Sequence, residues 1–440
     1  MRSLLPIALI AAMAGHAAAE RPRVVLLVLR GVSFASAPAP VAARAVPLVP
    51  IDGAVTAAAM GTLFTGAEPA RHGMVGNVYR EGFAGEEADA FAQRMLVEPV
   101  WEAAERQGRR VAALNVRLPG YRHDRVEASW TQRPEAAGGS HDASPTAFAR
   151  DLDEQVGPPP GAADLEGFLD GSVTADAFAA QVERWVLHRR ADIRHALARL
   201  PFDLLIVDEN VADAVLHPFT GREERHAQRA RRLAGETIAA VAEALPSDAT
   251  LLVVSPYGMA PVREAISVAR VLEAAGFAVA GRQARLRIAA YGPVAHVYLG
   301  SGVEPRPIET ALRNARDLAS GTPLFDRVER RGAHASLPLF HPVRGGDIVV
   351  LARAGTVLSS ESGPVAPRFP GDHGHAAAAP GAHGFFFAFA KARPLRLPPS
   401  VRDVDVAPIV ACLLGIAPPE QAQGRAHSLF EGRECVRTSR

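Results

Sequence analysis

Short apolar runs that are typical of buried strands alternate along this chain with longer, alanine-rich stretches that are typical of helices. Strands in such an alternation pair in parallel, because the helix between them carries the chain back across the sheet. The pattern therefore predicts an α/β fold, with a mostly parallel sheet and helices on both of its faces. The predicted strands are 24–29, 110–115, 203–207 and 250–254, and the predicted helices are 100–107, 175–200 and 223–245.

The alternation is interrupted at two places. The Pro-, Gly- and Ala-rich stretch 136–163 is typical of a surface loop. Residues 265–335 form a compact series of short elements, which predicts a smaller α/β lobe inserted into a core domain at residues 20–264 and 336–432. In the lobe we expect helices 266–275 and 307–319 and strands 278–280, 286–290 and 295–299; the core resumes with strands 346–352 and 385–389 and a helix at 406–414.

The first 19 residues have the three parts of a cleavable signal peptide. A basic start with Arg2 precedes an apolar run at 4–14, and the small residues Ala17 and Ala19 form an A-x-A cleavage site. The apolar run is too short to span a bilayer, and no later stretch is long and apolar enough to do so. We therefore expect a protein of the periplasm or the extracellular space, without a membrane span.

Two cysteines occur in the chain, Cys412 and Cys435. An oxidising compartment would allow a disulfide between them. The alternative is a free Cys412 buried in the apolar helix near the C-terminus. Spacing alone does not decide between them, because it does not fix the geometry of the two side chains.

The charge balance argues against a nucleic acid polymer or an acidic membrane as a partner. The chain has 48 Lys and Arg against 47 Asp and Glu, a formal net charge of +1. Such a balance supplies no overall attraction for a polyanion. The apolar fraction of 48% is ordinary for a globular protein and allows a large core.

The segment 55–77 contains the first candidate for chemistry. Thr56 opens a predicted helix, where free backbone N–H groups and the helix dipole favour a phosphate. A hydroxyl at such a place can act as a nucleophile, although a threonine there is more often only an N-cap. The helix is followed by a T-G-x-x-P-x-x-H-G run that ends at His72 and Gly73, and Asn77 comes soon afterwards.

A second group of polar residues has the spacing of metal ligands. Asp213 and His217 are four residues apart, so they can meet on one face of a helix and chelate a divalent ion such as Zn²⁺. A surface pair is the commoner outcome for such a spacing. A Gly/His-rich segment lies much later in the chain and contains His373, with His375 and His383 as alternatives.

These motifs, in this order, resemble the type I phosphodiesterase and nucleotide pyrophosphatase family of the alkaline phosphatase superfamily. The resemblance extends from about residue 24 to residue 424 and implies that family's fold. It places Thr56 on the nucleophile and Asn77 on a residue that holds a phosphate oxygen, and it makes His72 structural. It also implies that Asp213, His217 and His373 hold one zinc ion.

The resemblance fails at the second of the family's two zinc ions. Its ligands would be an Asp after the first strand and an Asp-His pair after a later one, but this chain has Arg30, Pro256 and Tyr257 there. Proline has no ligand atom, and a permanently charged guanidinium repels a cation. We therefore predict one zinc ion and no second site. Other acids, at Asp52, Asp208, Glu209 and Asp372, are expected in turns or in solvent.

Three functions fit this pattern. The chain could be an exported hydrolase of a small phosphate ester, with Thr56 as nucleophile and Arg30 in the electrostatic place of the lost ion. It could be an inactive relative that keeps a phosphate-ester pocket. It could also be a structural protein of the cell envelope whose ligands are relics. Without the second ion Thr56 has no obvious activator, which favours loss or strong reduction of activity, whereas family resemblance alone favours the hydrolase.

Overall fold

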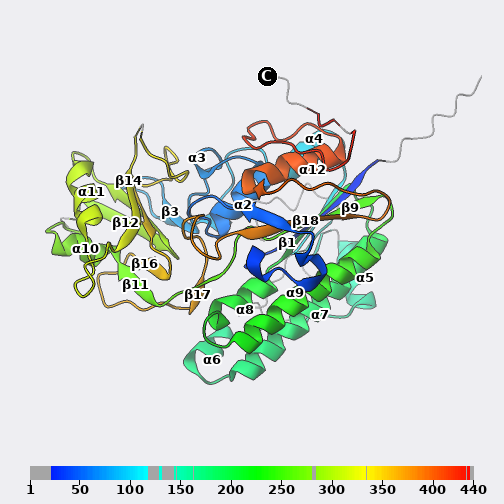
Figure 1. The fold of residues 1–440 in the computed structure, drawn as a ribbon, viewed down its shortest axis with the longest axis horizontal. Coiled ribbons are helices and arrows are strands. Elements are labelled where there is room, and N and C mark those ends of the chain that lie inside the picture. Colours follow the sequence, from blue (N-terminus) through cyan, green and yellow to red (C-terminus); the bar gives the residue numbers. More distant parts are fainter. Residues whose placement is uncertain are drawn as a thin grey trace, which may run out of the picture.

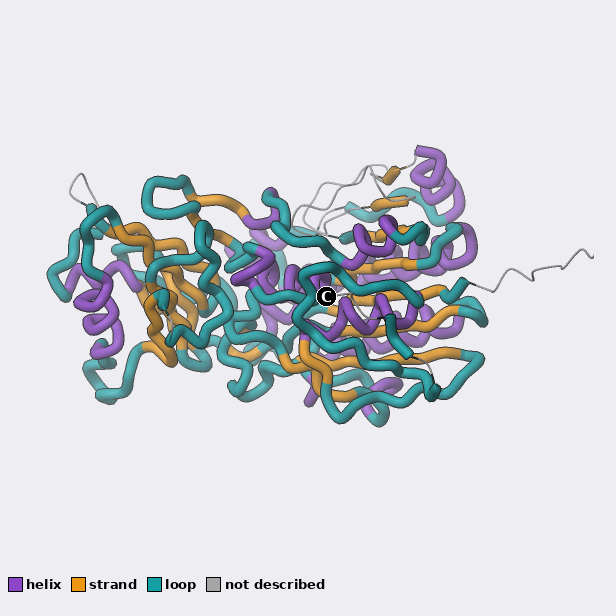
Figure 2. The backbone as a smooth tube through the Cα atoms, turned by 90° about the horizontal axis from the view of Figure 1, so that it is seen from above, coloured by secondary structure: helices purple, strands orange, loops and turns teal. Residues whose placement is uncertain are grey.

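A nine-stranded sheet forms the centre of the larger part of the molecule (Figures 1 and 2). The computed structural model describes residues 21–116, 128–130, 143–144, 146–161, 163–279, 284–332, 334–432 and 434–436, so the predicted signal peptide lies outside the described residues. In spatial order the strands are β19 (Val401–Arg402), β2 (Val46–Val49), β18 (Gly384–Ala390), β9 (Ala249–Val254), β1 (Arg23–Leu29), β8 (Leu204–Glu209), β5 (Val111–Leu114), β6 (Ala128–Trp130) and β7 (Ala143–Ser144).

The central strand β1 shows why helices cover both faces of this sheet. Its residues alternate between two apolar clusters, with Val25 and Leu27 in one and Val24 and Leu26 in the other. Both clusters are buried, so each face of β1 needs its own layer of helices. One layer is α7 (Ala175–Arg199), α8 (Val211–Phe219) and α9 (Glu224–Ala244); the other is α2 (Thr56–Thr65), α4 (Val100–Arg106) and α12 (Val406–Leu414), as Figure 1 shows.

The strand directions confirm the predicted mostly parallel α/β sheet. β1 pairs in parallel with β8 and β9, and β8 pairs in parallel with β5. β18 is antiparallel to β9 and β2. The smaller elements of the core are α1 (Ala39–Ala42), α3 (Pro69–His72), β3 (Val78–Arg80), β4 (Glu87–Asp89), α5 (Thr146–Gln155), α6 (Leu165–Asp170), β10 (Ala260–Pro261) and β17 (Gly371–Asp372). The helix α5 lies inside the stretch 136–163, where we predicted only a loop.

A four-stranded antiparallel sheet forms the centre of the smaller lobe, at the left of Figure 1. Its spatial order is β12 (Leu286–Tyr291), β13 (Val294–Leu299), β15 (Ile348–Ala352) and β14 (Phe325–Arg330). The helices α10 (Val268–Ala274) and α11 (Pro305–Asn314) pack on it, and β11 (Glu264–Ser267) pairs with β16 (Thr356–Ser359) beside it.

The position of β15 corrects the predicted boundary between the lobe and the core. We placed this strand in the core domain that resumes at residue 336, but it pairs with β13 and β14 of the lobe. Ile348 and Val350 face the lobe helices, whereas Val349 and Leu351 pack against core residues such as Val55. The strand is therefore apolar on both faces, as a central core strand would be, which is why its sequence misled the prediction.

None of the helices in the described ranges is both long enough and apolar enough to cross a membrane.

His72 fixes the segment that follows α2. Its Nδ1 accepts a hydrogen bond from the Met74 N–H at 3.1 Å, so its Nε2 carries the proton and donates to Thr62 Oγ1 at 3.0 Å. Thr62 in turn donates to the Ala58 carbonyl. Burial lowers the pKa of His72 to about 3. The imidazole is thus a neutral structural link, the role that the resemblance implies.

A disulfide joins Cys412 of α12 to Cys435, with a Cα–Cα distance of 4.7 Å. It ties the last described residues to a helix whose cysteine side chain is buried. Of the two alternatives that the sequence left open, a disulfide and a free Cys412, the structure has the disulfide.

We expect replacement of both Cys412 and Cys435 by alanine to lower the free energy of unfolding by about 3 kcal/mol, because the bond closes a loop across a sequence separation of 23 and so restricts the unfolded chain. Urea unfolding followed by circular dichroism measures this difference. Reduction of the native chain should match the double variant. An unchanged stability in both would show that the bond does not form.

A second prediction concerns acid. The pKa of His72 in the folded chain lies below its ordinary value of 6.5, so between pH 6.5 and 3 the unfolded chain binds a proton that the folded chain excludes. The contribution of His72 to the free energy of unfolding is then fully present above pH 6.5. It falls on acidification, by about 2 kcal/mol at pH 5. His296, whose pKa burial lowers to about 4, adds to the loss. Asp403, whose pKa burial raises to about 7, opposes it.

Comparison of wild type with His72→Gln isolates the His72 contribution. The free energy of unfolding between pH 7 and 5 should fall less steeply in the variant, whatever its absolute stability. An equal pH dependence of the free energy of unfolding in the two proteins would mean that His72 binds its proton equally well in the folded and the unfolded chain.

Candidate functional site

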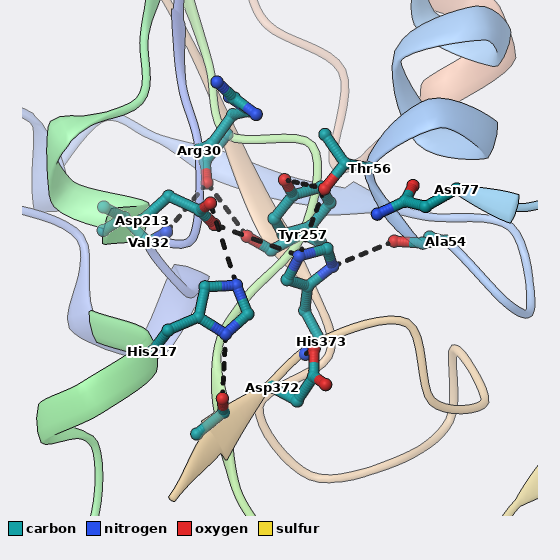
Figure 3. A network of polar contacts seen from close by, with 12 residues as sticks. Arg30, Val32, Ala54, Thr56, Asn77, Asp213, His217, Tyr257, Asp372 and His373 are labelled. Atoms are coloured by element: carbon teal, nitrogen blue, oxygen red, sulfur yellow. Dashed lines mark hydrogen bonds and ion pairs between the residues drawn. The ribbon is translucent and has the colours of Figure 1, made fainter. Parts of the chain in front are cut away.

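The predicted site residues come together at the carboxyl ends of the parallel strands (Figure 3). Arg30 directly follows β1, and Asp213 lies on α8 after β8. Tyr257 follows β9, Thr56 begins α2, and His373 follows β17. This edge of a parallel sheet is where α/β proteins generally bind ligands.

Three side chains form a cluster with the composition of a metal site. One ligand atom from each of Asp213, His217 and His373 lies within 4.8 Å of the other two. His217 Nε2 is 3.8 Å from Asp213 Oδ2, and His373 Nε2 is 4.0 Å from Asp213 Oδ1. The i, i+4 spacing on α8 brings the first two together, and the loop after β17 supplies the third.

Hydrogen bonds to the backbone set the tautomers of both histidines. His217 Nδ1 donates to the Gly371 carbonyl at 2.9 Å, and His373 Nδ1 donates to the Ala54 carbonyl at 3.2 Å. With Nδ1 used in this way, Nε2 is the nitrogen that each imidazole turns toward the Asp213 carboxylate. Burial lowers the pKa of His373 to about 4, which keeps it neutral.

Acceptor atoms that face one another need a cation between them. Asp213 Oδ1 is buried and has no hydrogen-bond partner, although an unpaired buried acceptor is costly. Two imidazole nitrogens and a carboxylate are a common ligand set for Zn²⁺, and carbonyl partners on the outer nitrogens are typical of its histidine ligands. The residues at this position therefore fit a zinc ion.

The residue before His217 does not disturb this cluster. The side chain of Leu216 is buried in the apolar cluster beneath α8. A close approach occurs at Gly371, where a Cβ atom would lie 2.7 Å from the Cβ of Thr220 and 2.9 Å from the Leu216 carbonyl oxygen. Glycine at 371 thus lets β17 reach His217.

Thr56 holds its hydroxyl toward this cluster. The N-cap of α2 is Val55, and Thr56 is the first residue of the helix. Thr56 Oγ1 lies 3.5 Å from His373 Nε2 and 3.3 Å from the Tyr257 hydroxyl. The hydroxyl is therefore not used as a cap, which was the alternative reading of this residue.

Asn77 is oriented by the same helix. Its Oδ1 accepts a hydrogen bond from the Ala57 N–H at 2.8 Å. The amide nitrogen is consequently turned toward Thr56 and His373, as Figure 3 shows. The start of α2 thus has both a hydroxyl and an amide donor facing the same space.

Arg30 takes the position where the resembled family has a carboxylate. Its Nε donates to Asp208 Oδ1 at 3.0 Å, and both side chains are almost completely buried. Burial alone would lower the pKa of Arg30, but Asp208, Tyr257 and Asp213 outweigh it and raise the pKa. The Nη2 atom is buried without a hydrogen-bond partner, and Arg30 lines a cavity described below.

No second metal cluster is present among the residues that the structure describes. Tyr257 stacks on His373, with ring centroids 3.6 Å apart. Burial, with Asp213, raises the pKa of Tyr257 well above 10, so its hydroxyl is protonated at neutral pH.

The alternative ligands considered from the sequence have other partners. Asp52 accepts from the Ala377 N–H and pairs with Arg327. Asp372 accepts from the His373 N–H, and Glu209 pairs with Arg189. His375 Nε2 bonds to the Thr356 carbonyl. His383 is not part of the cluster formed by the described residues.

A cavity of about 380 Å³ opens over Thr56, Asn77, Arg30, Asp213 and His217. Its remaining wall is largely apolar and comes from several elements. This wall includes Phe91, Leu165, Phe178, Val182, Tyr291, Phe369 and, at one side, Arg368. Sequence reasoning missed these residues, because they belong to separate segments without a shared motif.

The sequence profile of the type I phosphodiesterase / nucleotide pyrophosphatase family matches residues 43–376, most of the chain. The chain belongs to this family. The resemblance stated from its motifs is thereby confirmed. No curated protein sequence is significantly similar to it.

Several solved structures share the fold of this chain. Murine ectonucleotide pyrophosphatase / phosphodiesterase 5 has a TM-score of 0.60 at 16% identity, over 92% of this chain and 97% of that one. An inactive threonine-to-alanine variant of the murine protein, in complex with AMP, gives 0.60 at 15%, over 92% and 97%. Phosphonoacetate hydrolase from Sinorhizobium meliloti 1021, in complex with phosphonoacetate, gives 0.60 at 18%, over 88% and 94%.

We expect this phosphodiesterase-family chain to purify with one zinc ion, measured by elemental analysis after dialysis. Asp213→Ala or His373→Ala should remove it, because each leaves too few ligands. His375→Asn is the matched control, since it removes a buried histidine two residues away and should keep the metal. Two ions in the wild type, or loss of zinc in the control alone, would contradict this assignment.

Proposed function

We propose that this chain hydrolyses a small phosphate ester, with Thr56 as nucleophile, at a site that holds one zinc ion. The observation that carries the proposal is the placement of the Thr56 hydroxyl. It is free of any capping role, lies at the start of a helix, and borders both the cavity and the metal cluster. Membership in the phosphodiesterase family supports the reaction class.

The side chains around Thr56 have distinct roles in this proposal. Asp213, His217 and His373 would hold the ion, which when bound supplies positive charge beside the phosphoryl group. Asn77 and Arg30 both line the cavity and would donate to the other phosphoryl oxygens. Buried donors fixed in advance stabilise the charge that develops on these oxygens.

The reaction has two steps. Thr56 Oγ1 forms a bond to phosphorus while the ester P–O bond breaks, and the departing alcohol takes up the proton that Thr56 loses. Water then cleaves the phosphothreonine bond and restores the hydroxyl. An apolar cavity wall would bind the organic group of the ester. Two solved structures with the same fold are complexes with AMP and with phosphonoacetate.

The charges of the site favour a diester. Asp208 is matched by Arg30, so one divalent ion with Asp213 leaves a single net positive charge. A diester carries one negative charge, whereas a monoester carries nearly two at neutral pH. A site that lacks the second ion therefore suits the less charged ester.

Export is part of the proposal. The N-terminal 19 residues have the pattern of a signal peptide, and the Cys412–Cys435 disulfide is typical of an oxidising compartment. A periplasmic or secreted location follows from these two features.

One observation favours a second candidate, a protein that binds phosphate esters without turnover. The Tyr257 hydroxyl contacts Thr56, but its pKa is raised well above 10, so it is not a base at neutral pH. If the lost ion was essential for activating Thr56, the cavity would bind an ester and release it unchanged.

Hydrolysis of bis(p-nitrophenyl) phosphate by the zinc-loaded protein tests the proposal. We expect turnover that exceeds that of p-nitrophenyl phosphate. Thr56→Val keeps the branched shape but lacks the hydroxyl, and should lower kcat by more than about 10³-fold. Thr56→Ser keeps a hydroxyl and should retain measurable activity.

The outcomes separate the two candidates. Full activity in Thr56→Val would remove Thr56 as nucleophile. No hydrolysis by the wild type, together with calorimetric binding of AMP that is weakened by His373→Ala, would establish the binding protein instead.

A further inference from the structure

Tyr257 stands where the second metal ion of the family would have its ligands, and it contacts the proposed nucleophile directly. We propose that Tyr257 is a positioning residue for Thr56: its phenol donates a hydrogen bond to Thr56 Oγ1 and stabilises this oxygen as it becomes a nucleophile. The inference rests on the proposed function of Thr56. An uncharged side chain would then provide part of the stabilisation of the Thr56 oxygen that a second metal ion provides in the family.

The contacts of Tyr257 place its hydroxyl between two other groups of the site. The oxygen is 3.3 Å from Thr56 Oγ1, as the dashed line in Figure 3 shows. On its other side lies Arg30, whose charge interacts with the phenol. Tyr257 is only 1% exposed and does not border the cavity, so it acts on the substrate only through Thr56.

The chemistry of the neighbours fixes the direction of these hydrogen bonds. A guanidinium has donors and no acceptor, so a hydrogen bond between Arg30 and Tyr257 must end on the phenolic oxygen. The phenolic proton is then left for Thr56 Oγ1. His373 Nε2 lies 3.5 Å from Thr56 Oγ1, but as a proposed metal ligand it has no free lone pair for the Thr56 proton when the ion is bound. A donor to Thr56 Oγ1 thus stabilises this oxygen in its deprotonated form.

The phenol is held rigidly in this position. Its ring stacks on His373 with an angle of 3° between the planes, and it packs in an apolar cluster with Val55 and Ala58. The backbone before it is held by Ser255, whose Oγ accepts from the Val32 N–H at 3.1 Å and donates to the Tyr257 carbonyl at 3.0 Å.

The neighbouring strand leaves this backbone no room to shift. At Gly384 in β18, a Cβ atom would lie 1.8 Å from the Ser255 carbonyl oxygen. Such close packing keeps the phenol near Thr56 without a metal ion to anchor it. A donor fixed in advance spends no free energy on reorientation when charge develops on its acceptor.

Tyr257→Phe tests this role, because it keeps the ring and its stacking on His373 and removes only the hydroxyl. With bis(p-nitrophenyl) phosphate we expect kcat to fall roughly 100-fold, KM to stay within about twofold and zinc content to stay unchanged. The matched control is Tyr298→Phe. Tyr298 is also buried and its hydroxyl donates to the Arg344 carbonyl at 2.8 Å, but it lies in the lobe and outside the site.

A second measurement does not need turnover. Orthovanadate accepts an alcohol oxygen and mimics the transition state of phosphoryl transfer, whereas inorganic phosphate does not. Calorimetry should show vanadate binding more tightly than phosphate to the wild type. In Tyr257→Phe the vanadate affinity should fall roughly as much as kcat, while the phosphate affinity stays the same.

Each outcome is decisive. Unchanged kcat and vanadate affinity in Tyr257→Phe, with an active wild type, overturn the role of Tyr257 and leave the proposed function intact. Equal losses in Tyr298→Phe show a general effect of losing a buried hydroxyl and also overturn it. A wild type that neither hydrolyses the diester nor prefers vanadate overturns the proposed function and this inference together.

Discussion

The buried ion pair between Arg30 and Asp208 governs the chemistry of the whole site. Asp208 is completely buried at the end of β8, so its carboxylate needs a cation, and the guanidinium supplies a permanent one. Removal of one member of such a pair commonly costs 3–5 kcal/mol, because the other is left as an unpaired charge. A simple return to Asp at position 30 would place two carboxylates together. The positive charge in this half of the site is therefore the guanidinium of Arg30.

The two halves of the site are consequently different in kind. On one side, Asp213, His217 and His373 bring a carboxylate oxygen and two imidazole nitrogens within 4.8 Å of one another. On the other side, Arg30 and Tyr257 present donors around Thr56. A phosphoryl group between these two halves would have the candidate metal ligands on one side and the hydrogen-bond donors on the other. A metal ion and a hydrogen-bond donor can both stabilise the charge of a transition state, provided that they are held in position beforehand.

Sequence reasoning succeeded where the signal was local. The run 24–29 is apolar at every position and is buried on both faces, and the spacing of Asp213 and His217 brings them onto one helix face. It failed where partners are distant. The apolar strand Ile348–Ala352 gives no sign of which sheet it joins, and Arg30 and its partner Asp208 are 178 residues apart. The cavity wall could not be found, because Phe178 and Phe369 approach each other only in the folded chain.

The helix α5 was missed for a different reason. Its residues Thr146–Gln155 are flanked by a long stretch rich in Pro, Gly and Ala, whose composition suggested a loop. Composition averaged over a long stretch conceals one short amphipathic helix. A window shorter than three turns is needed to detect it.

The short pairing of β10 with β17 has a mechanical consequence. β10 begins three residues after Tyr257, and β17 ends one residue before His373, so the two hydrogen-bonded strands connect the segment of the phenol to that of the third proposed metal ligand. The stacked rings of Tyr257 and His373 join the same two segments a second time. Any shift of His373 is thus transmitted to the partner of Thr56 along two routes. Occupancy of the proposed metal site would therefore be coupled to the alignment of the Thr56 hydroxyl.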